Sequence, residues 1–313
     1  MARLLVRVAG ESDADRRLDQ VLAGWLDEPR SRTQQRLASG EVAVDGRLAG
    51  KSHRVRPGEE VTVARPPPAA RVDPPPPVPV RWADEHLMVI AKPAGLVVHP
   101  GAGTSSRPTL VDALRGQGVG LAIGGDPERP GIVHRLDRGT SGLLAVACSM
   151  EAYAGLVLAF RRHAVERVYW ALVDGVPDPP RATIEAPITR SRSQRTRFAV
   201  DPAGRAAVSH YDVEAAHRGC AELSVRLDTG RTHQVRVHLS AVGHPVAGDR
   251  TYGASVERAA ALGLRRPALH ARRLAFEHPV TGERVAVDEP LPDDLAAARS
   301  RAADRGLTPW RAC

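Results

Sequence analysis

The densest run of polar and charged side chains in the sequence lies between Gly131 and Ala147, as GIVHRLDRGTSGLLAVA. A loop bounded by glycines is followed there by an apolar strand, and rigid strands commonly present charged loops as active sites. Asp137 could serve as a nucleophile or a general base, although an isolated loop aspartate is more often a turn former. Ser141 is not a nucleophile elbow, because the G-x-S-x-G frame is absent. The chemistry that this segment predicts is therefore that of a carboxylate.

A second constellation spans residues 229–239, as TGRTHQVRVHL. Thr232 is expected to cap a helix, although the alternating valines also permit a strand. Arg231 stands just ahead of that helix, where backbone donors also favour anions. His233 and His238 are five residues apart, so on a helix they point about 140° away from each other and do not match a zinc helix. The segment predicts an anion-facing helix start and no metal site.

Two further features carry less information. Tyr169 lies in the strand-like run VERVYWA, where a core aromatic is the default interpretation. The segment from Gly101 to Gly103 lacks the third glycine and the Lys-Ser/Thr pair of phosphate loops, which argues against nucleotide binding.

Short apolar strands alternate with Gly/Pro turns through the second part of the chain. The expected strands are Leu87–Ile90, Leu143–Ala147, Tyr169–Val173 and Ala221–Leu227. The expected helices are Leu110–Leu114, Ala152–Arg162 and Thr232–Val242. This mixture predicts an α+β fold on a mixed, largely antiparallel sheet with flanking helices, rather than repeated βαβ units.

The first part of the chain predicts a small module of two helices and a sheet. Apolar residues recur with helical spacing from Leu18 to Leu26. Ser31 and Gln34 suit a capping box for a second helix, and Gly40 suits its left-handed end. Asp45-Gly46 marks a hairpin. Basic residues around the second helix favour RNA contact, the alternative being an ordinary solvated helix face.

This order of elements resembles the RNA-binding domain named after small ribosomal subunit protein four, here called the S-four domain. The resemblance rests on RLD at 17–19, SR at 31–32, GEVAVDG at 40–46 and VRPGE at 55–59, and covers roughly residues 15–65. It implies binding to structured RNA and no chemistry.

The charge balance favours a polyanionic partner. The 313 residues carry 44 basic and 36 acidic side chains, a net charge of +8, although the 42 arginines against two lysines also suit a GC-rich codon bias. Residues 30–56 hold seven basic and two acidic side chains, and residues 231–273 hold eight and two. Clusters of this kind suit phosphate binding. The candidate RNA contacts in these clusters are Arg30, Arg32, Arg36, Lys51, Arg54 and Arg236, and His134 and Arg135, beside Asp137, are two further candidates.

The organisation expected is a 1–65 RNA-binding domain, a 66–79 linker, an 80–300 catalytic domain and a 301–313 tail. Eight prolines in residues 66–79 favour an extended, semi-rigid tether over a proline-rich recognition ligand. No apolar run approaches the ~20 residues of a membrane span, and the charged start does not suit a secretory signal. Three scattered cysteines suit reduced thiols, so a cytoplasmic protein is expected.

Together the segments resemble the RluA/RluD-type RNA pseudouridine synthases across roughly residues 80–295. The matching stretches are Lys92–Gly101, Gly131–Ala147, Glu166–Val173, Thr229–Leu239, Gly243–Gly253 and His278–Glu283. The resemblance implies that Asp137 is the catalytic nucleophile, Tyr169 the active-site aromatic and Arg231 the partner of the aspartate. It also implies that Arg135 takes the place of an extruded base. Arg138-Gly139 and Val287-Asp288 depart from the family pattern, and the target nucleotide stays open.

The expected activity is conversion of specific uridines to pseudouridine, with 23S large-subunit ribosomal RNA as the expected substrate. The reaction needs no redox change or phosphate transfer, so neither a cofactor nor a metal is expected, and a monomer is the default. The alternative from another class is a non-catalytic protein that binds the ribosome or structured RNA. A nucleoside hydrolase with a carboxylate nucleophile is the second alternative, and it would release free uracil.

Overall fold

The computed structural model describes residues 4–50, 52–64, 75, 77–99, 108–126, 129–191, 194 and 197–304. The chain divides into two compact units, residues 1–73 and 74–313. Most of the proline-rich segment lies outside the described residues, as does the predicted turn at Gly101. In the part of the chain that is described, no helix is both long and apolar enough to cross a membrane.

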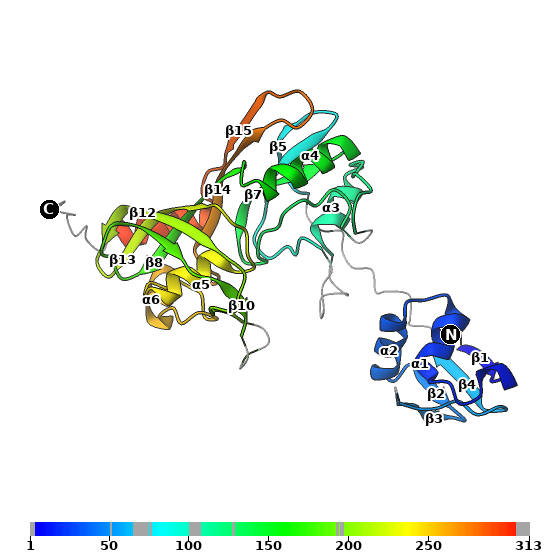
Figure 1. Ribbon diagram of the computed structural model, residues 1–313. Helices are drawn as coiled ribbons and strands as arrows, with labels where there is room; N and C mark the ends of the chain where they lie inside the picture. The colour runs from blue at the N-terminus through cyan, green and yellow to red at the C-terminus, as the bar shows by residue number, and fades with distance from the viewer. Residues whose placement is uncertain are drawn as a thin grey trace. The chain divides into compact units, whose positions relative to one another are not determined.

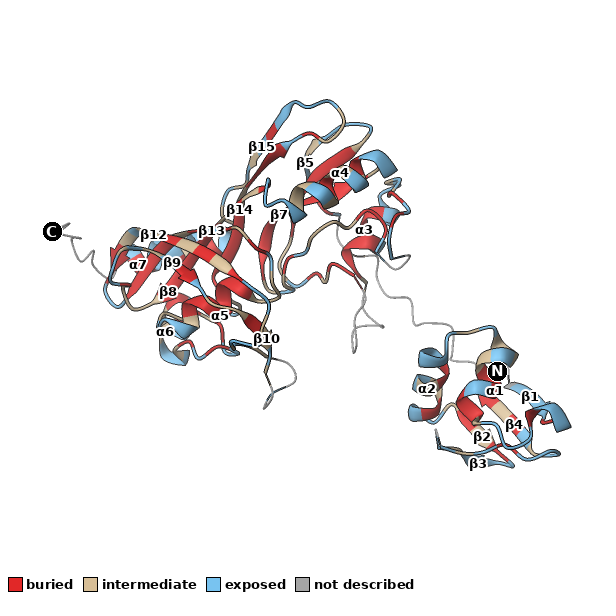
Figure 2. Ribbon diagram, viewed as in Figure 1, coloured by how far each residue is buried: buried red, intermediate tan, exposed pale blue. Residues whose placement is uncertain are grey.

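Unit 1 packs two helices on a four-stranded sheet. The strand order is β1 (Leu4–Val8), β4 (Glu60–Ala64), β2 (Val42–Val44) and β3 (Arg47–Leu48). A 3-10 turn (Glu11–Asp13) precedes α1 (Leu18–Leu26) and α2 (Arg30–Ala38). Buried leucines and valines of α1, α2, β2 and β4 form one core (Figures 1 and 2). The predicted helices and the Asp45-Gly46 hairpin are confirmed.

The predicted capping box of the second helix is wrong. The helix begins at Arg30 behind Pro29, and no side chain caps its first turn. The amide of Gln34 instead donates to the buried carboxylate of Asp19, at 2.7 Å. Gln34 therefore ties α2 to α1 rather than closing the helix on itself.

Unit 2 is built on a nine-stranded sheet. Along the sheet lie β5 (Val80–Ala83), β6 (Leu87–Lys92), β7 (Ser141–Ala147), β14 (Leu269–Glu277), β8 (Glu166–Asp174), β13 (Cys220–Leu227), β12 (Val208–His217) and β9 (Arg181–Glu185), with β15 (Arg284–Asp288) paired to β14. A separate pair joins β10 (Ile188–Arg190) and β11 (Phe198–Val200). Among the described strands only β7 and β14 run parallel, which confirms the expected mixed, largely antiparallel α+β fold.

Strands β6 and β7, near one end of the sheet, are buried along their whole length, because helices cover both faces. One face joins Ile90 and Leu144 to the leucines of α3 (Leu110–Gly116). The opposite face joins Val89 and Ala145 to α4 (Met150–Arg161). Figure 1 shows α3 and α4 beside this end of the sheet.

The other end of the sheet carries the remaining helices, α5 (Gln234–Ala241), α6 (Val256–Leu262) and α7 (Asp293–Asp304). Leucines of α5, α6 and α7 belong to the same core as β8 and β13. Helix α7 continues to Asp304, so residues 301–304 of the predicted tail are helical and buried Ala302 packs in the core.

A glycine allows β7 and β14 to meet. Gly142 has φ +115°, and a Cβ placed there would lie 2.3 Å from the carbonyl oxygen of Ala271 on β14. Beside it, the hydroxyl of Ser141 hydrogen-bonds Nδ1 of His270 at 2.9 Å. The close approach fixes the start of β7, and the loop that carries Asp137 ends at this point.

Candidate active site

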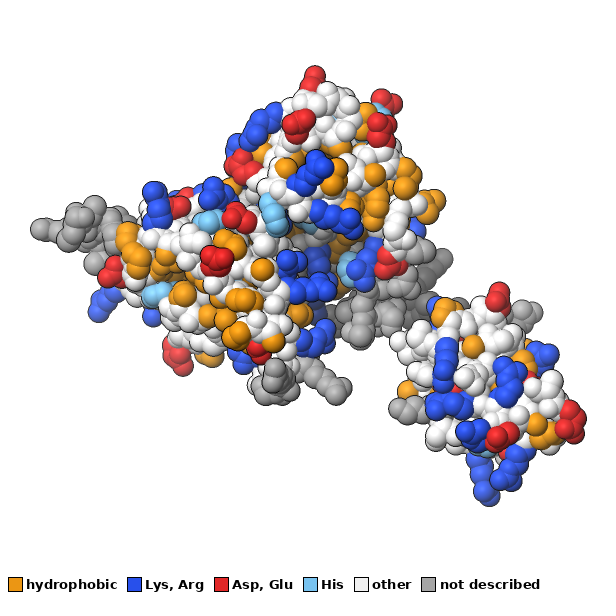
Figure 3. Space-filling view, in the orientation of Figure 1, with side chains coloured by type: hydrophobic (Ala, Val, Ile, Leu, Met, Phe, Trp, Pro, Cys, Tyr) orange, Lys and Arg blue, Asp and Glu red, His pale blue; other side chains and the backbone are white. Residues whose placement is uncertain are grey.

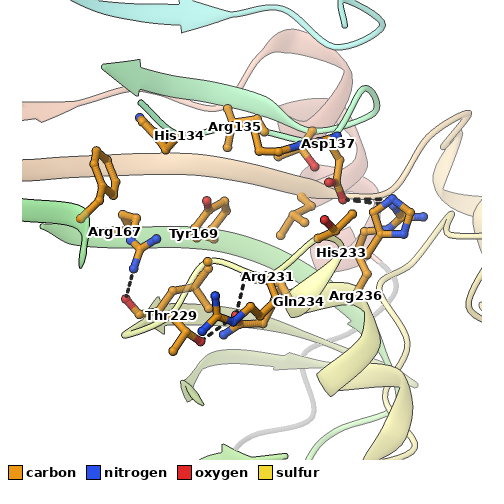
Figure 4. A pocket seen from close by; sticks show the side chains of 18 of the residues that line it. His134, Arg135, Asp137, Arg167, Tyr169, Thr229, Arg231, His233, Gln234 and Arg236 are labelled. Carbon is orange, nitrogen blue, oxygen red and sulfur yellow. Dashed lines mark hydrogen bonds and ion pairs between the residues drawn. The ribbon is translucent and has the colours of Figure 1, made fainter. Parts of the chain in front are cut away.

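A cavity of about 470 Å³ lies where the loop before β7, strand β8 and the loop before α5 converge. Asp137 comes from the first of these elements, Tyr169 from the second and Arg231 from the third, so the cavity brings together the three catalytic residues that the sequence predicted. Figure 4 shows Asp137 at one end of the cavity, Arg167 at the other and Tyr169 between them. The cavity also has apolar walls, which include Val133, Leu136, Val157, Phe160, Val235 and Leu269.

Asp137 is held by a guanidinium at the wall of this cavity. Its Oδ2 accepts a hydrogen bond from a terminal nitrogen of Arg236 at 3.1 Å, and 15% of its side chain is exposed. Nε2 of His233 lies 3.9 Å from the same oxygen. A carboxylate that is oriented by a cation and still open to the cavity suits a nucleophile or base.

Arg236 bridges two carboxylates. Its other two nitrogens form a fork on Asp249, at 2.5 and 3.0 Å, and the guanidinium lies 4.9 Å from the ring centre of Tyr252. Burial on its own would lower the pKa of Arg236, but the hydrogen bonds to Asp249 and Asp137 outweigh it and raise the pKa. The cation is therefore permanent and fixed in place.

The expectation that Arg231 pairs with Asp137 is wrong. Nε of Arg231 donates to the carbonyl of Ala206 at 2.9 Å, and Arg236 takes the position beside the aspartate. The RNA contact predicted for Arg236 stays a prediction: the guanidinium is buried and bonds two carboxylates, but it also lines the cavity. The pairing of Asp137 was predicted wrongly because α5 begins at Gln234, three residues after Arg231.

The loop before α5 is fixed by Gln234 rather than by the predicted Thr232 cap. The carbonyl oxygen of the Gln234 side chain accepts from the amide of Arg231 at 2.9 Å and from the Thr229 hydroxyl at 2.8 Å. Its amide nitrogen donates to the carbonyl of Val208 at 2.9 Å. His233 is in the left-handed conformation, with φ 59°, at the helix start. Gln234, Asp249 and Tyr252 were not predicted as site residues. The only sequence signal for them was that they lie in segments that resemble the family.

Tyr169 is buried beside the cavity. Burial raises the pKa of its phenol to about 12, so the hydroxyl is protonated at neutral pH. The hydroxyl forms no hydrogen bond with any described residue, while the ring lines the cavity. The residue can therefore stack on a ligand, and its hydroxyl is available to one.

His134 lines the cavity as a neutral ring. Its Nε2 accepts a hydrogen bond from the amide of Ala145 at 2.9 Å, and the ring stacks on Phe160 with centroids 4.4 Å apart. Burial, assisted by the nearby Arg167, lowers the pKa of His134 to about 3. The predicted RNA contact would therefore be made by the ring and not by a positive charge.

Arginines surround the cavity mouth, and one of them, Arg266, is paired with Asp294. Arg135 is exposed and lines the cavity, as the sequence predicted for a residue that meets RNA. A second groove, of about 270 Å³, shares Asp137 and Arg236 with the first, and it adds Arg138, Arg250, Arg265 and Arg266. Figure 3 shows basic side chains gathered along the hollow of unit 2. The electrostatic setting suits a polyanion.

The predicted RNA contacts of unit 1 are only partly available. Arg32 is 67% exposed, with Nε 4.0 Å from Glu28. Arg30 is about half exposed and donates to buried Asp19, and the exposed Arg54 donates to the carbonyl of Asp15. Lys51 lies outside the described residues.

Arg36, another predicted RNA contact, is paired within unit 1. Its side chain is only 14% exposed and its guanidinium donates to Glu28 at 2.8 and 2.9 Å and to Glu41 at 3.0 Å. Arg36 therefore links the segment before α2 to the segment after it, and its charge is paired inside the unit.

Comparisons with known proteins identify the family. The family model for RNA pseudouridylate synthase matches residues 86–241. A protein of Mycobacterium bovis, named as an uncharacterized RNA pseudouridine synthase, is 41% identical over 91% of this chain and 94% of its own length. Ribosomal large subunit pseudouridine synthase D of Zymomonas mobilis is 40% identical over 89% of this chain and 91% of its own. The chain belongs to the RNA pseudouridine synthase family.

The solved structure of human RNA pseudouridylate synthase domain containing 4 has the same fold, with a TM-score of 0.57 at 27% identity. The likeness covers 72% of this chain and 93% of the human chain. The protein is thus an RNA pseudouridine synthase, an isomerase, and the resemblance of residues 80–295 to this family is confirmed. Among the described residues there is no group of three His, Cys, Asp or Glu side chains that could hold a metal ion.

Proposed function

We propose that this synthase isomerises uridines of large-subunit ribosomal RNA and that Asp137 is its nucleophile. The observation that carries the proposal is the hydrogen bond from Arg236 to Asp137 at the wall of an open cavity. The named relative in Zymomonas mobilis supports the ribosomal substrate. In this site the carboxylate is oriented by a guanidinium that is itself held by Asp249.

The proposed mechanism begins with the carboxylate of Asp137. Asp137 attacks carbon 1′ of the ribose, and the electron pair of the C1′–N1 bond passes to the uracil. The base then turns, carbon 5 displaces the carboxylate from carbon 1′, and the proton on carbon 5 moves to a ring nitrogen. Because the phenol of Tyr169 is protonated, we assign it to stacking and to hydrogen bonding rather than to removal of that proton as a phenolate.

The base must leave its stack before it can enter the cavity, which costs a few kcal/mol. Arg135 is exposed at the cavity mouth, so it is placed to fill the vacated space. We further propose that unit 1 is an S-four-like domain that holds structured RNA through Arg32 and its exposed neighbours.

The experiment compares pseudouridine maps of ribosomal RNA from cells with and without this protein, followed by reconstitution with the purified protein. Specific large-subunit sites should disappear in the deletion and return on incubation. Loss of sites in another RNA would contradict the ribosomal substrate, and release of free uracil would support the hydrolase alternative. Binding without any new pseudouridine would support the non-catalytic alternative.

A further inference from the structure

Arg167 is a buried cation with no carboxylate oxygen at ion-pair distance in the described part of the chain. Arg167 and Arg236 are the two arginines among the described residues that are more than nine-tenths buried, each with 8% exposure. Arg236 is paired with two carboxylates, whereas Arg167 forms no ion pair with any described residue. A buried charge without a counter-ion is costly and indicates a charged or strongly polar ligand.

The hydrogen bonds of Arg167 leave part of its guanidinium unused. One terminal nitrogen donates to the carbonyls of Leu227 and Asp228, at 3.2 and 2.8 Å. Nε is buried and has no partner. The other terminal nitrogen lies against Gly230, another residue of the cavity wall.

The surroundings of Arg167 suit a flat ring better than a phosphate. The guanidinium lies 5.6 Å from the ring centre of Phe160, and the neutral His134 stacks on the same ring. Tyr169 stands two residues along β8, and therefore on the same face of the strand as Arg167. A phosphate would lose much hydration in this aromatic setting, whereas a nucleobase would stack.

We propose that Arg167 contacts the uracil of the reacting nucleotide and stabilises the negative charge that it carries while detached from the ribose. This inference rests on the proposed function. When the C1′–N1 bond breaks, its electron pair spreads over N1 and the two carbonyl oxygens of the base. A guanidinium hydrogen bond to one of these oxygens is then stronger than in the neutral uridine, so it lowers the barrier to bond cleavage.

The test measures the single-turnover rate at saturating RNA, RNA affinity over a series of salt concentrations, and melting temperature. Arg167→Met removes the charge and Arg167→Lys keeps it. Arg162→Met removes an exposed arginine that does not line the cavity, and this matched control should behave like the wild type. We expect Arg167→Met to slow turnover on the order of 10²-fold, with RNA affinity and its salt dependence unchanged, and Arg167→Lys to recover part of the rate.

Gly230→Ala provides a second variant if Arg167→Met fails to fold. Its methyl group would lie 2.7 Å from the guanidinium, which must move while its charge is kept. We expect a slower single turnover with unchanged RNA affinity.

A phosphate contact would instead weaken binding and reduce the salt slope by about one, with the saturated rate intact. That result would overturn the proposal. A wild-type rate in a folded Arg167→Met would also overturn it. Where Arg167→Met does not fold, a wild-type rate in Gly230→Ala would overturn it. Absence of turnover in the wild-type protein would contradict the proposed function itself, so the two failures are distinguishable.

Discussion

Replacement of Arg236 by methionine tests the ion-pair bridge directly. The change leaves both Asp137 and Asp249 without their shared cation, and only 1% of the Asp249 side chain is exposed. Breaking a buried pair by removing one partner destabilises a protein by about 3–5 kcal/mol. For a domain of this size each kcal/mol lowers the melting temperature by about 2–4 °C, so we expect a fall of roughly 6–20 °C together with loss of turnover.

The assay combines calorimetry with tritium release from RNA that is labelled at carbon 5 of uridine. Arg231→Met is the matched control, because that guanidinium donates only to a carbonyl in this structure. It should melt close to the wild-type temperature. The double variant Arg236→Met/Asp249→Asn should be more stable than Arg236→Met alone, since the uncompensated buried carboxylate is gone. The reasoning is refuted if Arg236→Met melts and turns over like the wild type, or if Arg231→Met is the more damaging change.

Three further predictions concern single side chains. Arg32→Gln should weaken binding to structured RNA and leave the melting of unit 1 unchanged, whereas Arg36→Gln should destabilise unit 1; filter binding and thermal melts separate the two effects. Burial alone would raise the pKa of Asp19, but hydrogen bonds from Arg17, Gln34 and Arg30 hold that pKa well below its usual range. Unit 1 should therefore lose stability as the pH falls below about 4. Hydrogen exchange of unit 1 should show this loss, and Asp19→Asn should flatten it. Tyr169→Phe should retain more activity than Tyr169→Leu, because stacking is preserved; equal loss in both would mean that the hydroxyl carries the function.

Local patterns were sufficient to predict most elements of the fold. The apolar spacing from Leu18 to Leu26 matches α1, and the strand predicted at Leu143–Ala147 lies within β7. Gly40 marks the left-handed turn after α2, as its type suggested. These features depend on neighbours within a few residues, which is why composition and spacing suffice.

The partner of Asp137 could not be found by the same route. Arg231 and Arg236 are five residues apart, and which of them reaches the aspartate depends on where α5 begins. That start is fixed by Gln234, through bonds to a distant strand at Val208, and by the left-handed His233. Contacts between residues far apart in sequence are set by tertiary packing and leave no periodic signal.

Arginines that look alike in sequence also differ in how far the structure buries them. Arg32 and Arg36 lie one turn apart on α2, yet one is exposed and the other is neutralised by Glu28 and Glu41. Arg167 drew no attention in the sequence, because a basic residue in a strand is ordinary. Its burial without an ion pair to any described residue, and with an unpartnered Nε, makes it a candidate for substrate contact.

The carboxylate of Asp137 is the group on which the whole account depends. Asp137→Asn preserves the shape of the side chain and can still accept a hydrogen bond from Arg236, so the protein should fold and bind RNA. The decisive measurement is release of tritium from carbon 5 of uridine in a single turnover with saturating RNA. We predict no release above background from Asp137→Asn under conditions where the wild-type protein reacts fully. Turnover by the asparagine variant would contradict the assignment of Asp137 as nucleophile.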